Sequence, residues 1–311
     1  MKTCLQYNLN ISQLGYLLPL ATFLFACETV VDLEIPFDKP QVTLNANLQN
    51  NLFPAVRLTY SKHILDNDWE FSPIPDAAVS LIHQNERYPL RFNEETGEYT
   101  NLQLLLREGN TYTLEAELPG YELVRATESI PLSVPIKQVV YQGRVQMDSW
   151  SSREDVRLLF DDPEGENYYE ISADYFGYYS YVDEQGNTVL YENNYPLYLE
   201  PKNPTYERDY NTYGKLLIDD RLFDGQEANL ELFIESSFSP DDQGGEIRFT
   251  LKTVSRNYFQ FHTTYGLQWW NEGDPFAQPV QVFSNISNGI GILMAESLSV
   301  LTLSPPPQQE Q

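Results

Sequence analysis

The sequence predicts a mainly β protein, in which an N-terminal immunoglobulin-like β-sandwich is followed by a second β-rich domain with one main helix. Three observations lead to this fold class. Short runs of alternating apolar and polar residues recur along the chain, as they do in half-buried antiparallel strands. Glycine and proline pairs that are typical of turns separate these runs. One segment, which follows Ser255, has its apolar residues at helical spacing.

The sandwich is expected over residues 40–135. Three of its predicted strands present an apolar face made by Val56, Leu58 and Tyr60, by Tyr88, Leu90 and Phe92, and by Tyr112, Leu114, Ala116 and Leu118. Short strands of this kind, repeated over about 100 residues, are typical of an immunoglobulin-like sandwich. Pro131 and Pro135 cannot donate backbone hydrogen bonds to a sheet, so we place a domain boundary there.

The second domain is expected over residues 136–303. Its strands are predicted from four alternating runs, which centre on Leu158, Ile171, Leu232 and Phe249. The stretch 176–213 is rich in tyrosine, asparagine, glutamate and proline without a clear period, and we expect long loops or an irregular insertion there. The proline-rich end, residues 304–311, is expected to be a disordered tail.

A helix is expected from Ser255, because serine is a favourable N-cap and aromatic residues follow at intervals of three and four. These residues are Tyr258, Phe261, His262 and Tyr265. We expect the aromatic stripe to pack on a sheet.

Residues 1–26 are expected to be a lipoprotein signal peptide. Their apolar stretch of 13 residues is too short to span a bilayer but suits a signal-peptide core. The stretch runs through Leu24 and Ala26 to Cys27, which resembles a bacterial lipobox with cleavage after Ala26. Acyl chains such as palmitate on Cys27 would hold the protein at a membrane, with residues 27–39 as a tether. The alternative is an ordinary secretory signal that leaves Cys27 as a thiol.

The charge and the cysteine content exclude several classes of site. The formal net charge is −26, so nucleic acid is not expected as a partner, because phosphate binding requires clustered lysine and arginine. The two cysteines are Cys4 and Cys27. A mature chain that starts at Cys27 therefore has no disulfide and no cysteine-based zinc site.

No catalytic site and no cofactor are expected. The three histidines, His63, His83 and His262, lie far apart in the sequence. The chain also lacks a Gly-x-Ser-x-Gly motif, a phosphate-binding loop and a complete dinucleotide fingerprint. An enzyme would need carboxylates or histidines that converge in one pocket.

Acidic stretches offer metal-type ligands, but we expect no metal site. His63, Asp66 and Asp68 lie at short spacing, as zinc ligands can, yet such triplets are common in acidic loops. The carboxylates within residues 161–166 could hold calcium, but they lack the alternating aspartates of a calcium loop. A strand-ending turn is the preferred interpretation there and at residues 219–220.

Aromatic side chains are candidate ligand contacts, because sugars stack on exposed rings. The candidates are Trp69, Trp269, Trp270 and Phe276. Neighbouring side chains diverge on a helix and on a strand, so Trp269 and Trp270 cannot form one flat platform. We expect at least one of them to lie in the core.

The run 274–292 contains a turn with Asn285, Asn288, Gly289 and Gly291, which we call the signature turn. An Asn-Gly pair favours a turn with positive φ, and Gly291 allows close approach of another backbone. We therefore prefer a structural role for the signature turn over a partner contact.

This run resembles a segment typical of domain-of-unknown-function family 4249, a group of Bacteroidota lipoproteins. The lipobox and four further segments are similar to the same family; these are residues 74–81, 97–99, 160–169 and 223–225. The resemblance implies a non-catalytic lipoprotein of the outer membrane, lipid-anchored at the cell surface. It also implies that the partner is a TonB-dependent receptor, to which the protein is an uptake accessory. The alternative is a surface glycan-binding or adhesive lipoprotein with a glycan or peptide ligand.

Overall fold

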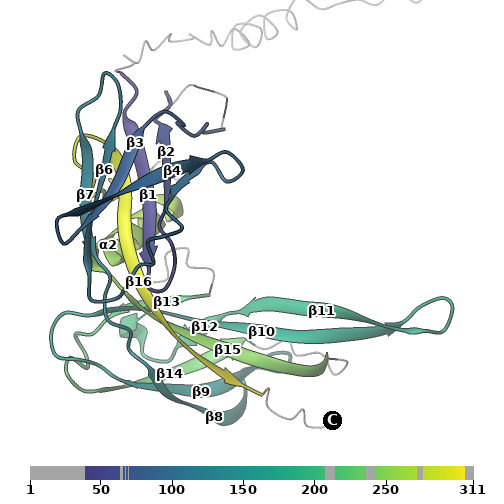
Figure 1. The fold of residues 1–311 in the computed structure, drawn as a ribbon. Coiled ribbons are helices and arrows are strands. Elements are labelled where there is room, and N and C mark those ends of the chain that lie inside the picture. Colours follow the sequence, from purple (N-terminus) through teal and green to yellow (C-terminus); the bar gives the residue numbers. More distant parts are fainter. Residues whose placement is uncertain are drawn as a thin grey trace, which may run out of the picture. The chain divides into compact units, whose positions relative to one another are not determined.

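The computed structural model describes residues 39–63, 66, 68, 70–206, 214–235, 242–271 and 276–304. Within them the protein is mainly β with a single α-helix, which confirms the predicted fold class (Figure 1). The immunoglobulin-like detail of the N-terminal part stays a prediction. The signal peptide, the tether up to residue 38 and the tail from residue 305 lie outside the described residues. No helix among the described residues is long and apolar enough to cross a membrane.

The N-terminal part is built from seven strands. They are β1 (Val42–Gln49), β2 (Ala55–Tyr60), β3 (Ala78–His83), β4 (Glu86–Asn93), β5 (Glu98–Thr100), β6 (Thr111–Glu117) and β7 (Val124–Ser129). Their order in the sheet is β1-β2-β5-β4-β3-β6-β7. Burial alternates along β1 and β7, because successive side chains of a strand point to opposite faces. The buried faces, with Leu44, Leu58 and Leu114 among them, form a first hydrophobic core.

The C-terminal part contains the remaining elements. They are β8 (Ile136–Gln146), β9 (Ser152–Asp161), β10 (Tyr168–Val182), β11 (Thr188–Leu197), β12 (Leu199–Pro201), the 3₁₀ helix η1 (Pro204–Tyr206), β13 (Leu216–Asp219), β14 (Glu227–Glu235), β15 (Asp242–Val254), α2 (Arg256–Trp270) and β16 (Ile290–Leu303). A four-stranded sheet has the order β12-β14-β9-β8. Its apolar side chains, such as Leu158, share a second core with those of the large sheet, such as Ile171.

Strand β16 belongs to both parts of the chain. Its first half pairs in parallel with β1 and its second half pairs antiparallel with β15, and Glu296 stands where the two pairings meet. The large sheet therefore contains twelve strands and runs from β11 through β16 into β1. The two cores divide between Ile130 and Val134, except that residues 286–295 contribute to the first one. The predicted segment 136–303 thus supplies a strand to the N-terminal sheet, which local sequence patterns cannot reveal.

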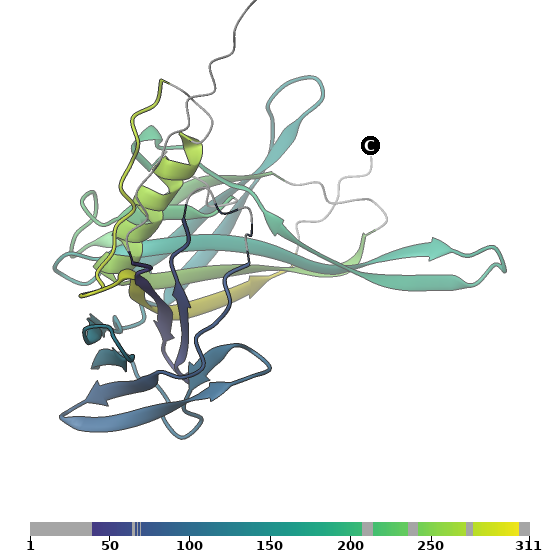
Figure 2. The same cartoon turned by 90° about the horizontal axis from the view of Figure 1, so that it is seen from above.

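The predicted helix and its cap are confirmed. The Ser255 side chain accepts a hydrogen bond from the Tyr258 backbone N–H at 3.2 Å, as an N-cap does. Helix α2 packs against β16 and β10, and Figure 2 shows it beside the large sheet. Tyr258 is buried in this contact, and its ring lies 4.3 Å from that of His262. The start of the aromatic stripe therefore packs on a sheet, as predicted, whereas Tyr265 at its end is 45% exposed.

The expectation of long loops over residues 176–213 is wrong for most of that stretch. Strands β10 and β11 pair from Ala173–Leu197 out to Val182–Thr188 and form a long hairpin. The rings of Tyr181 and Tyr191 stack across it, with centroids 5.5 Å apart. Both faces of the outer hairpin are exposed, so its sequence lacks the apolar and polar alternation that predicts a strand. Residues 207–213 lie outside the described residues.

Candidate functional site

The signature turn serves as a structural joint at the start of β16. Asn288 has a φ of 59°, and its side-chain amide donates to the Leu123 carbonyl at 2.9 Å. Gly291 has a φ of 111°, and a Cβ atom there would overlap the carbonyl oxygen of Leu44 on β1. A Cβ on Gly289 would lie 2.7 Å from the carbonyl oxygen of Val42. These glycines let β16 approach β1 closely.

Asn285 fixes the turn from its other side. Its side-chain oxygen accepts from the Leu293 N–H at 2.9 Å, and its amide donates to the Leu293 carbonyl at 2.7 Å. The side chain therefore substitutes for a strand partner next to β16. These contacts agree with the structural role that we preferred for the signature turn.

Two other segments that carry the family resemblance also meet each other. The Tyr99 hydroxyl donates to the Ile74 carbonyl at 2.7 Å and accepts from the Ala77 N–H at 2.9 Å. A Cβ on Gly97 would lie 3.1 Å from Pro73. Segments 74–81 and 97–99 are thus parts of one packed corner.

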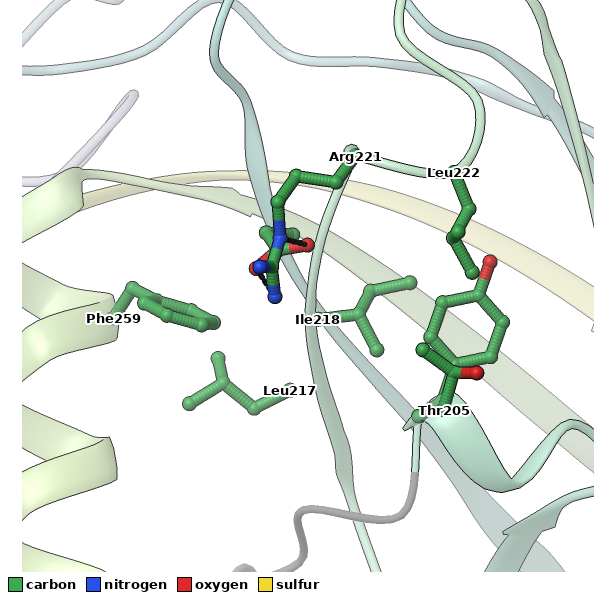
Figure 3. A pocket seen from close by; sticks show the side chains of 8 residues that line it. Thr205, Leu217, Ile218, Arg221, Leu222 and Phe259 are labelled. Carbon is green, nitrogen blue, oxygen red and sulfur yellow. Dashed lines mark hydrogen bonds and ion pairs between the residues drawn. The ribbon is translucent and has the colours of Figure 1, made fainter.

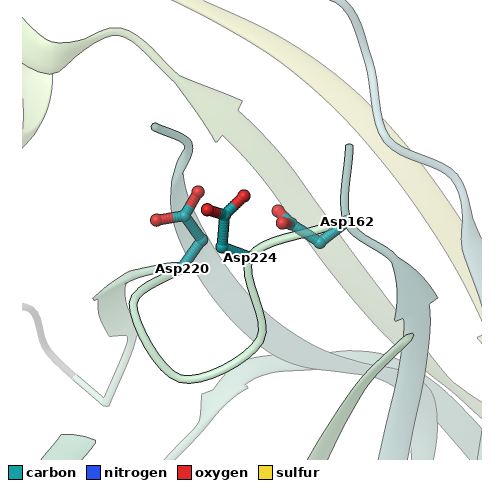
Figure 4. Close-up of side chains that lie close together, drawn as sticks. All are labelled: Asp162, Asp220 and Asp224. Atoms are coloured by element: carbon teal, nitrogen blue, oxygen red, sulfur yellow. The ribbon is translucent and has the colours of Figure 1, made fainter. Parts of the chain in front are cut away.

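Segments 160–169 and 223–225 meet at an acidic cluster that consists of Asp162, Asp220 and Asp224 (Figure 4). Oxygen atoms of the three carboxylates lie within 4.8 Å of one another. Beside them, the ring of Phe160 lies 4.8 Å from that of Tyr169 and 5.7 Å from that of Phe223. The sequence predicts separate turns at residues 161–166 and 219–220, and it does not single out Asp224.

Each carboxylate of the acidic cluster accepts a backbone hydrogen bond from the opposite loop. Asp162 accepts from the Tyr169 hydroxyl and from the Gly225 N–H, the latter at 2.9 Å. Asp220 accepts from the backbone N–H of Asn167 at 2.6 Å, and Asp224 accepts from that of Gly165 at 2.9 Å. The cluster therefore ties the loop after β9 to the loop after β13.

Burial and mutual repulsion disfavour the charged forms of these carboxylates. Burial raises the pKa of Asp162 and of Asp220, and the negative charge of Asp224 raises both further. Burial and the adjacent Asp162 also raise the pKa of Tyr169. Three carboxylates at this spacing offer the hard oxygen ligands that a divalent cation such as calcium prefers. Their backbone hydrogen bonds show that these carboxylates connect the loop after β9 to the loop after β13.

A small hollow lies between α2, η1 and β13 (Figure 3). Its volume is about 230 Å³, and Phe259 and Leu217 lie across it from Thr205 and Leu222. The Arg221 guanidinium pairs with the Asp219 carboxylate at 2.8 Å at its rim. The hollow is smaller than a typical drug-sized ligand site.

The structure describes three of the four aromatic candidates. Trp69 lies outside the described residues. Trp269 and Trp270 end helix α2 with 44% and 69% of their surface exposed, so the expectation that one of them lies in the core is wrong. Phe276 is 93% exposed. Successive side chains of a helix diverge by about 100°, so the two tryptophans point in different directions.

Sequence reasoning missed a group of exposed aromatic and apolar side chains on the β10–β11 hairpin. We call its outer part, residues 178–192, the hairpin arm. Its exposed members are Tyr178, Tyr181, Val182, Leu190 and Tyr191. The recurrence of tyrosine at residues 179, 181, 191 and 195 was the available signal, since aromatic residues favour strands.

The fold and these surfaces define a β-rich protein with tightly tied loops and an exposed aromatic arm. The chain matches the family described as Domain of unknown function (DUF4249) over residues 28–299, and it belongs to that family. No curated protein matches the chain.

Proposed function

We propose that this protein is a non-catalytic, lipid-anchored lipoprotein of the outer membrane that acts as an accessory to a TonB-dependent uptake system. The resemblance described above motivates the proposal, and membership of the DUF4249 family is consistent with it. The lipobox that ends at Cys27 supports the anchor, because several acyl chains hold a protein stably at a membrane.

The observation that carries the proposal is the hairpin arm. Strand β15 pairs with β10 only as far as Tyr179, so among the described strands the end of β10 pairs with β11 alone. Figure 1 shows the hairpin running out past β15. Contiguous exposed apolar side chains on a protein surface mark sites of interaction with other macromolecules. An arm of this kind suits a docking protein.

The test is co-purification after mild detergent extraction. The tagged full chain is expected to bring down a TonB-dependent receptor, and the double variant Tyr181→Ser, Tyr191→Ser is expected to lose it. Trp150→Ser is the control, because Trp150 is 96% exposed on the separate β8–β9 hairpin. A pull-down that contains only the bait, or equal losses in both variants, would contradict the proposal.

The anchor has its own test. The Cys27→Ser variant is expected to leave the membrane fraction, and mass spectrometry of the wild-type N-terminus is expected to show acyl chains on Cys27. An unacylated Cys27, or a serine variant that stays in the membrane fraction, would remove the anchor from the proposal.

A glycan-binding surface lipoprotein is the second candidate. The stacked rings of Tyr181 and Tyr191, inclined by 18°, present outer faces on which a sugar ring can lie. Affinity electrophoresis in gels that contain polysaccharide is the direct test. Retardation that Tyr181→Ser abolishes and Trp150→Ser preserves would favour this candidate over the uptake role.

A further inference from the structure

Where β15 pairs with the inner part of β10, an arginine side chain lies between an aromatic ring and a carboxylate. The Arg248 guanidinium on β15 lies 4.1 Å from the centre of the Phe176 ring on β10. It also pairs with the Glu246 carboxylate at 3.0 Å. Phe176 stands opposite Glu246 in the β10–β15 register, and Arg248 stands opposite Asp174 two positions further in, so the three side chains lie on one face of the sheet. Arginine commonly stacks on aromatic rings in this way.

In the next row outward a ring and a carboxylate again stand opposite each other, and no cation from the described part of the chain lies with them. Tyr178 on β10 stands directly opposite Glu192 on β11, on the same face as Phe176 and Glu246. Tyr178 is 48% exposed and Glu192 is exposed. Among the described residues, no lysine or arginine pairs with Glu192 or lies over the Tyr178 ring. Both side chains line a groove of about 400 Å³ that extends to Glu246.

The hairpin also offers a backbone edge beside this groove. Strand β11 is the outermost strand of the large sheet among the described strands. Its residues Thr188, Leu190, Tyr191 and Glu192 are exposed. The outer edge of such a strand is a template for an additional strand, whose alternate side chains would reach the grooved face. An added strand beside Glu192 would place a side chain next to the groove.

The negative charge of the hairpin indicates the charge of its partner. Residues 168–197 contain five carboxylates and no lysine or arginine. An acidic surface attracts a basic segment and repels an acidic one, including a second copy of a chain whose net charge is −26. We propose that an extended, basic segment of a partner polypeptide adds to the β11 edge and places a lysine or arginine side chain against Tyr178 and Glu192. This inference rests on the proposed docking role of the hairpin arm and names the chemistry of its partner.

The test is binding of a labelled peptide to the full chain, followed by fluorescence anisotropy. The probe is acetyl-Thr-Val-Arg-Val-Arg-Val-Thr-amide, and the comparison probe has citrulline, which is neutral, in place of each arginine. Binding is expected for the arginine peptide and is expected to weaken at high salt. Equal binding of the citrulline peptide would overturn the proposal.

Variants locate the contact. Glu192→Gln is expected to weaken binding about tenfold. The variant loses an exposed ion pair, and it also weakens the cation–π contact with Tyr178 because the cation is less firmly positioned over the ring. Glu184→Gln makes the same charge change at the exposed turn of the hairpin, outside the groove, and is expected to leave the affinity nearly unchanged. Tyr178→Phe keeps the ring and is expected to keep binding, whereas Tyr178→Leu is expected to lose it. Equal effects of the two glutamate variants would overturn the proposal.

Backbone pairing has a separate readout. Two versions of the peptide, N-methylated at odd or at even positions, each lose one set of backbone donors. One version is expected to lose binding and the other to keep it, because only alternate residues of a strand face its neighbour. Equal binding of both would overturn edge pairing, and so would self-association of the chain that excludes the peptide.

The two proposals can fail independently. Co-purification of a receptor that is insensitive to Glu192→Gln would leave the uptake role and remove the basic partner segment. Peptide binding that depends on Glu192, without any receptor in the pull-down, would do the reverse.

Discussion

The Tyr258 hydroxyl of helix α2 donates a hydrogen bond to the Glu170 carboxylate of β10 at 2.7 Å, within the buried contact between the helix and the sheet. Lys252 of β15 lies beneath the same contact, 3.2 Å from Glu170 and 3.0 Å from Glu296 of β16. Burial alone would raise the pKa of Glu170, but attraction to Lys252 and Lys215 outweighs it and leaves this pKa lowered. The two carboxylates, Glu170 and Glu296, are therefore balanced by the ammonium groups of Lys252 and Lys215.

Lys252→Met is therefore expected to destabilise the protein strongly. It leaves Glu170 and Glu296, each 3% exposed, as buried carboxylates without their shared cation. Breaking a buried ion pair in this way costs about 3–5 kcal/mol. Urea unfolding measures the loss, and Lys137→Met is the control because Lys137 pairs with Asp161 and Glu227 at the surface. Equal losses in the two variants would show that the buried network contributes nothing beyond a surface pair.

Gly291→Ala is expected to weaken the joint between β16 and β1. Gly143 has a similar φ, 124° against 111°, but a Cβ atom there would meet nothing within 4 Å. Gly143→Ala therefore measures backbone strain alone, and Gly291→Ala adds the overlap with the Leu44 carbonyl. We expect Gly291→Ala to cost about 1–3 kcal/mol more, which is the usual penalty of overpacking. If thermal unfolding shows the same loss for both, the close approach of β1 is not what requires glycine.

Asp220→Asn is expected to change the pH dependence of stability. The pKa of Asp220 is raised in the folded protein, so the folded state binds its proton more tightly than the unfolded state does. The stability from this group is fully present below its unfolded value of 3.8 and is lost as the pH rises through the folded pKa. Asparagine does not titrate, so the free energy of unfolding of the variant is expected to rise relative to that of the wild type between about pH 4 and neutral pH.

Urea unfolding in the presence of EDTA, at a series of pH values, measures this gain without interference from divalent cations. Asp148→Asn is the control, since hydrogen bonds from Trp150 and Ser151 lower the pKa of Asp148 and give the opposite sign. A difference between Asp220→Asn and wild type that stays constant with pH would refute the argument.

Ser255→Ala is expected to destabilise helix α2 and its seat on the sheet. The Ser255 hydroxyl accepts from the N–H of Tyr258 and donates to the Glu128 carboxylate at 2.9 Å. Loss of an N-cap costs about 0.5–2 kcal/mol. Ser255→Asp keeps a capping oxygen but places a second carboxylate beside buried Glu128, so it is expected to rescue less than Ser255→Thr. Full stability of the alanine variant in guanidinium unfolding would refute the role of the cap.

Local features of the fold could be predicted from the sequence, and long-range ones could not. Ser255 and its helix were predictable because a cap and its first turn are adjacent in the chain. The strands around Leu58 and Leu114 were predictable because each buries one face. The pairing of β16 with β1 joins residues more than 240 positions apart and depends on the whole topology.

For the candidate surfaces too, local features could be predicted from the sequence and long-range contacts could not. Asn288 and the glycines near it favour a structural role for the signature turn, but its contact with Leu123 is not visible in the sequence. Asp162 and Asp224 meet only because two loops fold together. Tyr178 and Glu192 face each other through the register of a hairpin whose two exposed faces hide the usual periodicity.

The position of β16 also sets the order of events when the chain is made. Strand β1 is the first of the described strands to be made, yet its parallel neighbour, β16, is the last of them. Until residues 290–296 have been made, the edge of β1 that they occupy in the fold is open, and closing so long a loop is slow. A chain that is released before residue 290 lacks β16, so the edge of β1 stays unpaired. Premature termination in the second half of the chain therefore exposes an aggregation-prone strand edge in the first half.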